Sequence, residues 1–326
     1  MLSILLIICL QLGDILTECP PKEMLSPCTC KDDDIKCEGN IELDLANIFQ
    51  KMSQSETRIQ KHFKRFYAMN KIIKELPENT FKDFTFDVIY FDTCHNLAKI
   101  HENAFGQTNL VTKSITFWRS PKLSSPDNSI FNLVSKFINA EYMVLSWLNI
   151  SEVPAHAFKP INGLQDKLKY LEIRGPSFTK IDDNAFYSLN NLTELRIWDT
   201  KNQLISKNVF AFERKSDEVL TIRLTNCTFM KNFNFEQDAF LNLKRPANLI
   251  INGNGNPYLE EKVFLPFLLA DERNVLTTDQ LLDCNDCRNV WLKKYKAIHN
   301  RVKSLTCSNS KLLTDSSNFV KCIKLS

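Results

Sequence analysis

I-D-D-N-A-F-Y-S-L-N-N-L-T-E-L-R-I-W-D-T, residues 181–200, is the stretch of sequence that decides the fold. Ile181 is followed five residues later by Phe186. Leu192, Leu195 and Ile197 then follow the spacing L-x-x-L-x-L. This order predicts one returning segment and one short strand, in a unit of roughly 20–30 residues that has to stack on copies of itself.

Both features recur along the chain. An apolar residue or proline stands five positions before a phenylalanine in eight pairs: Leu76/Phe81, Ile100/Phe105, Pro126/Phe131, Val153/Phe158, Ile181/Phe186, Ile205/Phe210, Phe235/Phe240 and Leu259/Phe264. The steps between these phenylalanines are 24, 26, 27, 28, 24, 30 and 24 residues. Between the pairs lies the signature L-x-x-L-x-L-x-x-N/C, with last positions at Cys94, Ser120, Leu148, Pro176, Thr200, Cys227 and Asn254. Because two independent features share one period, we interpret the chain as leucine-rich repeats rather than as one compact α/β domain.

We therefore predict an α/β solenoid, a leucine-rich-repeat horseshoe with a parallel sheet on its concave face and a phenylalanine column behind it. The predicted division is a signal peptide over residues 1–17, an N-terminal Cys-rich cap over 18–60, about eight repeats over 61–275 and a C-terminal Cys-rich cap over 276–326. The formal net charge is +3, so nothing in the composition requires nucleic acid or an anionic membrane as a partner.

Residues 1–13 are an uncharged, strongly apolar run, M-L-S-I-L-L-I-I-C-L-Q-L-G. The run is too short to cross a bilayer, and we interpret it as the apolar region of a secretory signal peptide. An N-terminal membrane anchor is the alternative. We find no other stretch long enough to span a membrane, so the sequence predicts a secreted, extracellular protein.

Cysteine usage supports export. Of 11 cysteines, four lie near the start (Cys19, Cys28, Cys30 and Cys37) and four near the end (Cys284, Cys287, Cys307 and Cys322). An even number at each end predicts two disulfide-stapled caps, which would cover the open ends of the repeat core. A zinc site and a redox C-x-x-C at Cys284–Cys287 are the alternatives, and both lack the usual context. Cys94 and Cys227 fall five strand steps apart, roughly 24 Å, so we expect two free thiols there.

The N-terminal C-x-C-x6-C and the C-terminal C-N-D-C-R-N-V-W-L resemble the caps of extracellular leucine-rich-repeat proteins. L-S-P-C-T-C-K-D-D-D-I-K-C-E-G-N-I-E-L-D-L-A-N-I-F-Q-K-M-S and E-L-P-E-N-T-F are similar to the arthropod group that includes the non-catalytic leucine-rich-repeat subunit of shrimp luciferase. This resemblance implies secretion and a binding or stabilising role, since the catalytic chain of that group is a separate protein. The resembling caps also imply the pairs Cys19–Cys30, Cys28–Cys37, Cys284–Cys307 and Cys287–Cys322, whereas spacing alone allows three pairings per cap.

We find no catalytic motif, metal site or cofactor site in the sequence, and we predict that the chain is not an enzyme. The five histidines form no H-E-x-x-H or similar spacing, and no glycine-rich phosphate loop is present. The acidic run Asp32–Asp34 lacks the spaced ligands of a calcium loop.

The informative surface is the outward side of the sheet. Strand alternation turns the x residues of the signature away from the core. Trp and Arg dominate protein interfaces, and they gather at these positions. The predicted ligand-binding residues are Tyr90, Trp118, Trp147, Glu172, Arg174, Arg196, Trp198 and Arg223. The plainer interpretation is that these side chains only cover the sheet, with Glu172 pairing Arg196 across neighbouring strands.

The sequence predicts one of two functions. In the first, the concave face binds or stabilises a protein partner, which could be a catalytic subunit. In the second, the chain is an extracellular matrix or immune-recognition protein that binds a glycan or a microbial surface. Sequons at Asn149, Asn191 and Asn226 predict a glycoprotein. The sequence does not predict the oligomeric state.

Overall fold

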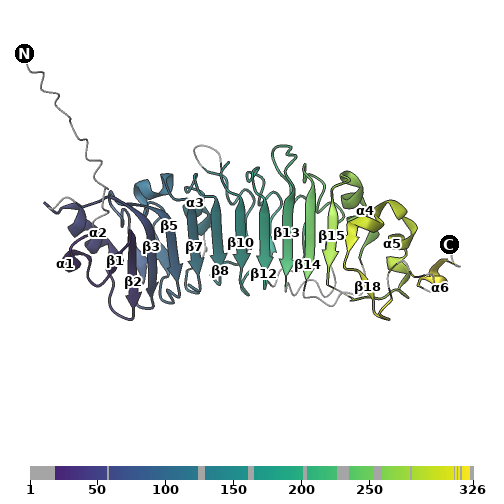
Figure 1. Cartoon of the computed structure of the whole chain (residues 1–326), viewed down its shortest axis with the longest axis horizontal. Coiled ribbons are helices and arrows are strands. Elements are labelled where there is room, and N and C mark those ends of the chain that lie inside the picture. The colour runs from purple at the N-terminus through teal and green to yellow at the C-terminus, as the bar shows by residue number, and fades with distance from the viewer. Residues whose placement is uncertain are drawn as a thin grey trace, which may run out of the picture.

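The computed structural model describes residues 19–56, 59–123, 129–160, 165–200, 204–225, 235–252, 259–279, 281–311, 313, 315 and 318–323. It is an elongated slab in which strands lie side by side from one end to the other, with the two caps at opposite ends (Figure 1). Twelve strands form one sheet in the order β1-β2-β3-β5-β7-β8-β10-β12-β13-β14-β15-β17. All neighbours are parallel except β1 and β2, so the sheet grows by one strand per repeat.

The strands of this sheet from Thr85–Asp92 to Ala247–Asn252 follow the seven predicted signatures. Their bounds are β1 Thr29–Lys31, β2 Asp34–Gly39, β3 His62–Asn70, β5 Thr85–Asp92, β7 Ser114–Trp118, β8 Tyr142–Ser146, β10 Tyr170–Arg174, β12 Glu194–Trp198, β13 Leu220–Thr225, β14 Ala247–Asn252, β15 Val275–Thr278 and β17 Val302–Lys303. Leu171, Leu195, Ile222 and Leu249 lie in register and are fully buried. The fold is thus a capped leucine-rich-repeat solenoid. One detail of the predicted register is wrong: Val219 is exposed, and the buried role passes to Leu220, where β13 begins.

Behind the sheet, the returning segments carry short strands and helices. The short strands are β4 Glu75–Leu76, β6 Lys99–Ile100, β9 Glu152–Val153, β11 Lys180–Ile181, β16 Leu281–Leu282 and β18 Thr306–Cys307. The α-helices are α1 Lys22–Leu25, α2 Leu45–Ser53, α3 Ser129–Val134, α4 Glu261–Ala270, α5 Trp291–Lys294 and α6 Val320–Ile323. Short 3-10 turns are η1 Gly106–Leu110, η3 Cys287–Asn289 and η4 Lys296–Arg301.

The predicted phenylalanine column runs through the core, with one break. Neighbouring rings contact each other from Phe131 to Phe264, with centroids 5.3–6.5 Å apart. Phe81 stacks on Phe105, but Phe105 then meets Phe137 at 5.2 Å. Phe131 lies on helix α3, so the neighbour of Phe105 in the core comes from the segment after that helix. Pro126, Cys227 and Asn254 lie outside the described residues.

Aromatic side chains close both ends of this core. Phe49 on α2 packs against Phe66, Phe81, Phe84 and Phe86, with centroids 4.9–5.9 Å away. At the other end, Trp291 is fully buried and donates its indole N–H to the Leu259 carbonyl at 2.9 Å. These buried aromatic side chains cover the two ends of the core, where each terminal repeat lacks a neighbour.

Four disulfides hold the caps, and they are the pairs that the resemblance implies: Cys19–Cys30, Cys28–Cys37, Cys284–Cys307 and Cys287–Cys322. Cys94 is a free, buried thiol, as predicted, and burial raises its pKa to about 11. The sheet continues through both predicted cap boundaries, because β2 pairs with β3 and β15 pairs with β17. The division into caps and repeats therefore stays a prediction.

The predicted signal peptide, residues 1–17, lies outside the described residues. Within the described ranges, no helix is long and apolar enough to cross a membrane.

Candidate functional site

Strand pairing places the predicted surface residues in two adjacent columns on the outward side of the sheet. One column runs Tyr90, Thr116, Val144, Glu172, Arg196, Arg223 and Ile250. The next column, at the ends of the strands, runs Asp92, Trp118, Ser146, Arg174, Trp198, Thr225 and Asn252. We call the eight predicted residues Tyr90, Trp118, Trp147, Glu172, Arg174, Arg196, Trp198 and Arg223 the Trp–Arg surface.

A recurring turn supplies the rest of the site. The residue after the end of β5, β7, β8 and β12 has a left-handed backbone: φ is 54° at Thr93, 52° at Arg119, 55° at Trp147 and 49° at Asp199. The N–H of each of these residues donates to the carbonyl of the last residue of the next strand, at 2.7–3.1 Å. Such a conformation costs roughly 1–2 kcal/mol for a residue with a side chain. Here the continued hydrogen-bond ladder offsets that cost, and three of the side chains return to the edge of the sheet: Arg119, Trp147 and Asp199 contact residues of the edge column.

Arg174 lies at the centre of this edge. Its guanidinium carbon is 5.9 Å from the Trp118 ring, 5.6 Å from the Trp147 ring and 5.6 Å from the Trp198 ring. Asp199 accepts a hydrogen bond from Arg174 Nε at 2.7 Å and forms an ion pair with it. We call Trp118, Trp147, Arg174, Trp198 and Asp199 the Arg174 cage. Cation–π contacts of this kind contribute roughly 0.5–2 kcal/mol each.

A second charged group lies beside the cage. Glu194 Oε1 accepts hydrogen bonds from Arg196 Nε at 2.7 Å and from Arg223 Nε at 2.8 Å, which links β12 to β13. Burial alone would raise the pKa of Glu194, but the two arginine hydrogen bonds outweigh it, and the pKa is lowered. The expected pair between Glu172 and Arg196 is therefore corrected: Arg196 bonds Glu194 on its own strand, and Glu172 accepts from the Tyr170 hydroxyl at 2.7 Å.

Aromatic residues form a layer over the middle of the sheet. Tyr142 stacks on Tyr170 with centroids 4.2 Å apart, and Tyr67 stacks on Tyr90 at 5.1 Å. Several outward-facing residues beneath this layer are buried although they point away from the main core: Thr116, Val144, Ser146 and Glu172. The plainer interpretation is thus partly right, because the aromatic side chains do cover the sheet. Trp147 nevertheless remains 37% exposed, and Trp118 and Trp198 remain partly exposed.

The charges on this face balance locally. Four arginines lie on it, Arg119, Arg174, Arg196 and Arg223, and four carboxylates, Asp92, Glu172, Glu194 and Asp199, lie on the same strands or turns. Arg119 Nη2 contacts Asp92 Oδ1 at 3.0 Å, which completes the set of paired groups along the edge. A partner that covers this face would therefore leave no net charge buried.

The structure brings five predicted residues into one contact network: Trp118, Trp147, Arg174, Arg196 and Trp198. Arg223 joins them through Glu194, whereas Tyr90 pairs with Tyr67 at the N-terminal side. Sequence reasoning missed Arg119, Glu194 and Asp199, and it placed Asp92 in the outward column without including it among the binding residues. The signal that marks two of them is the position immediately after each predicted strand, where Arg119 and Asp199 both stand.

Other polar groups give no catalytic arrangement among the described residues. His62 Nδ1 is 3.0 Å from Thr85 Oγ1 and His62 Nε2 is 3.5 Å from Asp87 Oδ2. However, the group is exposed, and Lys113 also pairs with Asp87 at 3.1 Å. No cluster of metal-ligating side chains occurs in the part of the chain that the structure describes. Asn149 and Asn191 are exposed, and Asn191 Nδ2 donates to the Asp166 carbonyl at 2.6 Å. Asn226 lies outside the described residues.

Comparison with known proteins gives one curated relative of this chain. The chain is similar to the non-catalytic subunit of Oplophorus-luciferin 2-monooxygenase from Oplophorus gracilirostris, with 24% identity over 208 residues, 62% of this chain and 54% of that subunit. The chain thus spans about half the length of this curated relative. This relative belongs to the arthropod group that the sequence resembles. Its name describes a non-catalytic subunit, which agrees with the prediction that the chain is not an enzyme. No family model matches the chain.

Two solved structures are also similar. Human 5T4 (Wnt-activated inhibitory factor 1, trophoblast glycoprotein) has 14% identity and a TM-score of 0.49, covering 92% of this chain and 99% of its own. The Toll–Spatzle complex of Drosophila has 11% identity and a TM-score of 0.34, covering 78% of this chain and 45% of its own. The fold assignment rests on this chain's own repeats and strand pairing.

Proposed function

We propose that this chain is a secreted, non-enzymatic protein that binds a partner protein through the Trp–Arg surface. The observation that carries the proposal is the Arg174 cage: three indole rings and one compensated arginine form a single patch on the open side of the sheet. Tryptophan and arginine are the residues whose removal most often costs binding energy at protein interfaces.

The electrostatics of the patch favour a partner that removes water from it. A desolvated charge is costly unless it is paired and hydrogen-bonded. Arg174 is paired with Asp199, Arg196 and Arg223 share Glu194, and the charge of Glu172 also acts on Arg196. The three positive charges therefore have three carboxylates around them when a partner covers them. We therefore infer that binding depends on shape and aromatic contact, and that added salt weakens it little.

The relative supports the type of partner. Its name describes a non-catalytic subunit of an enzyme, and such a chain acts with another polypeptide. By analogy, we infer a companion role for this chain toward a separate protein, which could be catalytic. The disulfide caps support an extracellular location, and Asn149 and Asn191 are then glycan acceptors that lie in exposed positions.

The test compares capture by three forms of the native chain: wild type, Trp147→Ala and Leu110→Ala. Leu110 is a matched control because it is exposed and lies on the returning segment η1 rather than on the sheet. Proteins held by wild type and Leu110→Ala but lost with Trp147→Ala would support the proposal, and the affinity of the recovered protein would then be measured. If all three forms capture the same set, the surface is not the binding site. Loss of binding to a glycan array with Trp147→Ala, without any protein partner, would favour the glycan alternative.

A further inference from the structure

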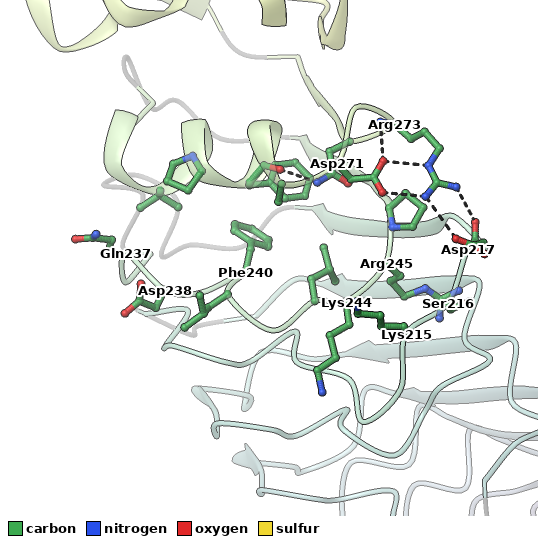
Figure 2. Close-up of a pocket in the computed structure, with 18 residues that line it drawn as sticks. Lys215, Ser216, Asp217, Gln237, Asp238, Phe240, Lys244, Arg245, Asp271 and Arg273 are labelled. Carbon is green, nitrogen blue, oxygen red and sulfur yellow. Dashed lines mark hydrogen bonds and ion pairs between the residues drawn. The ribbon is translucent and has the colours of Figure 1, made fainter.

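A cavity of about 480 Å³ lies on the other edge of the sheet, away from the Arg174 cage. The cage is built from the ends of strands, whereas this cavity is lined by segments that precede β13, β14 and β15 and by helix α4. Figure 2 shows Phe240 in the middle of the cavity, with α4 above it. A volume of this size lies within the range of pockets that hold small molecules, roughly 300–1,000 Å³.

The middle of the cavity is apolar. Phe240 and Phe267 contact each other with centroids 4.9 Å apart, and Leu243, Val263 and Pro266 extend the same wall. Asn274 fixes the wall in place, because its Nδ2 donates to the Phe267 carbonyl at 2.6 Å and its Oδ1 accepts from Ala247 N at 2.7 Å. Hydrogen bonds within the chain therefore hold this apolar wall in place, and no ligand is needed to order it.

The two ends of the cavity differ in charge. Gln237 and Asp238 lie at one end. Three cations, Arg245, Arg273 and Lys215, lie at the other end, together with the carboxylates of Asp217 and Asp271 (Figure 2). The charge of Arg273 is compensated, since it forms a bidentate contact with Asp271 at 2.9 and 3.0 Å. Lys215 is exposed and adds positive charge at this end.

Arg245 is the unusual group. It is only 5% exposed, and its guanidinium donates to the backbone carbonyls of Glu218 and Asn190 at 2.8–3.0 Å. Within the described residues, no carboxylate lies within ion-pair distance of it. These three hydrogen bonds hold the side chain rigidly, and all three acceptors are neutral backbone carbonyl oxygens. Burial lowers the pKa of Arg245, and the negative charge of Glu218 offsets this only in part, so the buried charge is incompletely compensated.

We propose that this cavity binds a small amphiphilic anion, with its apolar body on Phe240 and Phe267 and its acidic head at the Arg245 end. A carboxylate there adds an anionic partner to a buried cation whose own hydrogen-bond acceptors are neutral carbonyl oxygens, and charged hydrogen bonds of this type are about twice as strong as neutral ones. The site is independent of the Trp–Arg surface, so either assignment can fail without the other.

Dodecanoate is the probe, and dodecanol is the neutral comparison, both titrated into the full chain below their aggregation concentrations. We expect one bound dodecanoate per chain and binding of dodecanol about tenfold weaker or more, as expected for loss of a hydrogen bond to a charged group. Wild-type protein that binds no dodecanoate, or that binds both probes equally, would overturn the proposal.

Two variants locate the site. Ala270→Trp fills the cavity from an exposed position, and Leu269→Trp places the same ring on the neighbouring exposed residue, which does not line the cavity. Dodecanoate affinity should fall at least tenfold in Ala270→Trp and stay at the wild-type value in Leu269→Trp. Equal affinity in both variants would place the probe elsewhere. Arg245→Gln should remove the preference for dodecanoate over dodecanol. The Arg245 side chain also holds two backbone carbonyls, so this variant could fail to fold. In that case the result with Ala270→Trp alone tests whether the probe binds in the cavity.

Discussion

Strands β7 to β12 and strands β13 to β15 form one continuous sheet, yet their outward sides differ. The first group presents the tryptophans, tyrosines and paired arginines of the site. Apart from Arg223 on β13, the second group presents small or neutral residues: Thr221, Thr225, Asn248, Ile250, Asn252 and Thr277. Their inward sides are alike, with buried residues, mostly leucine and isoleucine, in register.

The comparison separates what the fold requires from what it does not. Every repeat has to fill the same core, so the inward residues follow one pattern. The C-terminal strands show that a strand of this sheet needs no aromatic cover on its outward side. The aromatic layer on β7 to β12 therefore calls for an explanation beyond the repeat itself, and partner binding is the one that we propose.

The largest expected effect tests whether the inward sides are equivalent. Leu195 on β12 and Leu249 on β14 are both fully buried and occupy the same repeat position. Changing either one to alanine should lower the free energy of unfolding by about 2–5 kcal/mol, measured by denaturant titration. A much smaller cost for Leu249→Ala would mean that the C-terminal repeats do not share the core of the others.

The second prediction concerns the outward sides, where the two groups should differ. Trp198→Ala should leave the chain folded and weaken binding to the recovered partner by about 2 kcal/mol, roughly thirtyfold. Trp118→Ala should act in the same direction because it belongs to the same cage. Ile250→Ala is the matched control on β14, and binding should not change. Equal binding by all three variants would place the partner on the convex side or on a cap.

Much of this comparison can be predicted from the sequence. The L-x-x-L-x-L spacing fixes which residues of each strand face outward, and the pairing of Trp118, Ser146, Arg174 and Trp198 along the edge follows from it. The contacts within the cage do not follow. They depend on left-handed turns at Trp147 and Asp199. Tryptophan gives no sign of a positive φ, and aspartate, although enriched at positive φ, adopts other conformations more often.

The core shows the same limit. The step from Phe105 to Phe131 is 26 residues and fits the period, but helix α3 removes Phe131 from contact with Phe105. Periodicity predicts where a side chain lies in the repeat, whereas an inserted helix decides which neighbour it meets. Such an insertion has no fixed spacing that a repeat pattern could reveal.

The third prediction tests whether the Asp199 carboxylate compensates the positive charge of Arg174. In Asp199→Asn, the arginine keeps its three tryptophan neighbours but loses its carboxylate partner at 2.7 Å. We expect a loss of about 1 kcal/mol in unfolding free energy, since both side chains are only about one quarter exposed. Asp217→Asn serves as the control because that side chain is fully exposed and lies 3.8 Å from Arg273. Equal stability of the two variants would show that the Arg174–Asp199 pair contributes nothing to the cage.

The smallest expected effect lies at the seam between the two groups, where Glu194 on β12 holds Arg196 and Arg223. Burial opposes ionisation, but the two arginine hydrogen bonds lower the pKa of Glu194 below its ordinary value. A carboxyl whose pKa is lower in the folded state stabilises the fold above the unfolded pKa, about 4.3, and that contribution is lost as the pH falls through the folded pKa. Wild type should therefore lose more unfolding free energy than Glu194→Gln between pH 6 and pH 3.

Other carboxylates titrate in the same window, so the difference between the two proteins carries the information. Glu141→Gln is the matched control, because Glu141 pairs with Lys169 at 2.7 Å and both side chains are about half exposed. Solvent screens that pair, and its removal should change the pH dependence less than Glu194→Gln does. If Glu194→Gln and wild type lose the same free energy, Glu194 does not bind the arginines in solution. The outward face of β13 would then be independent of β12, and the patch proposed for the partner would end at Trp198.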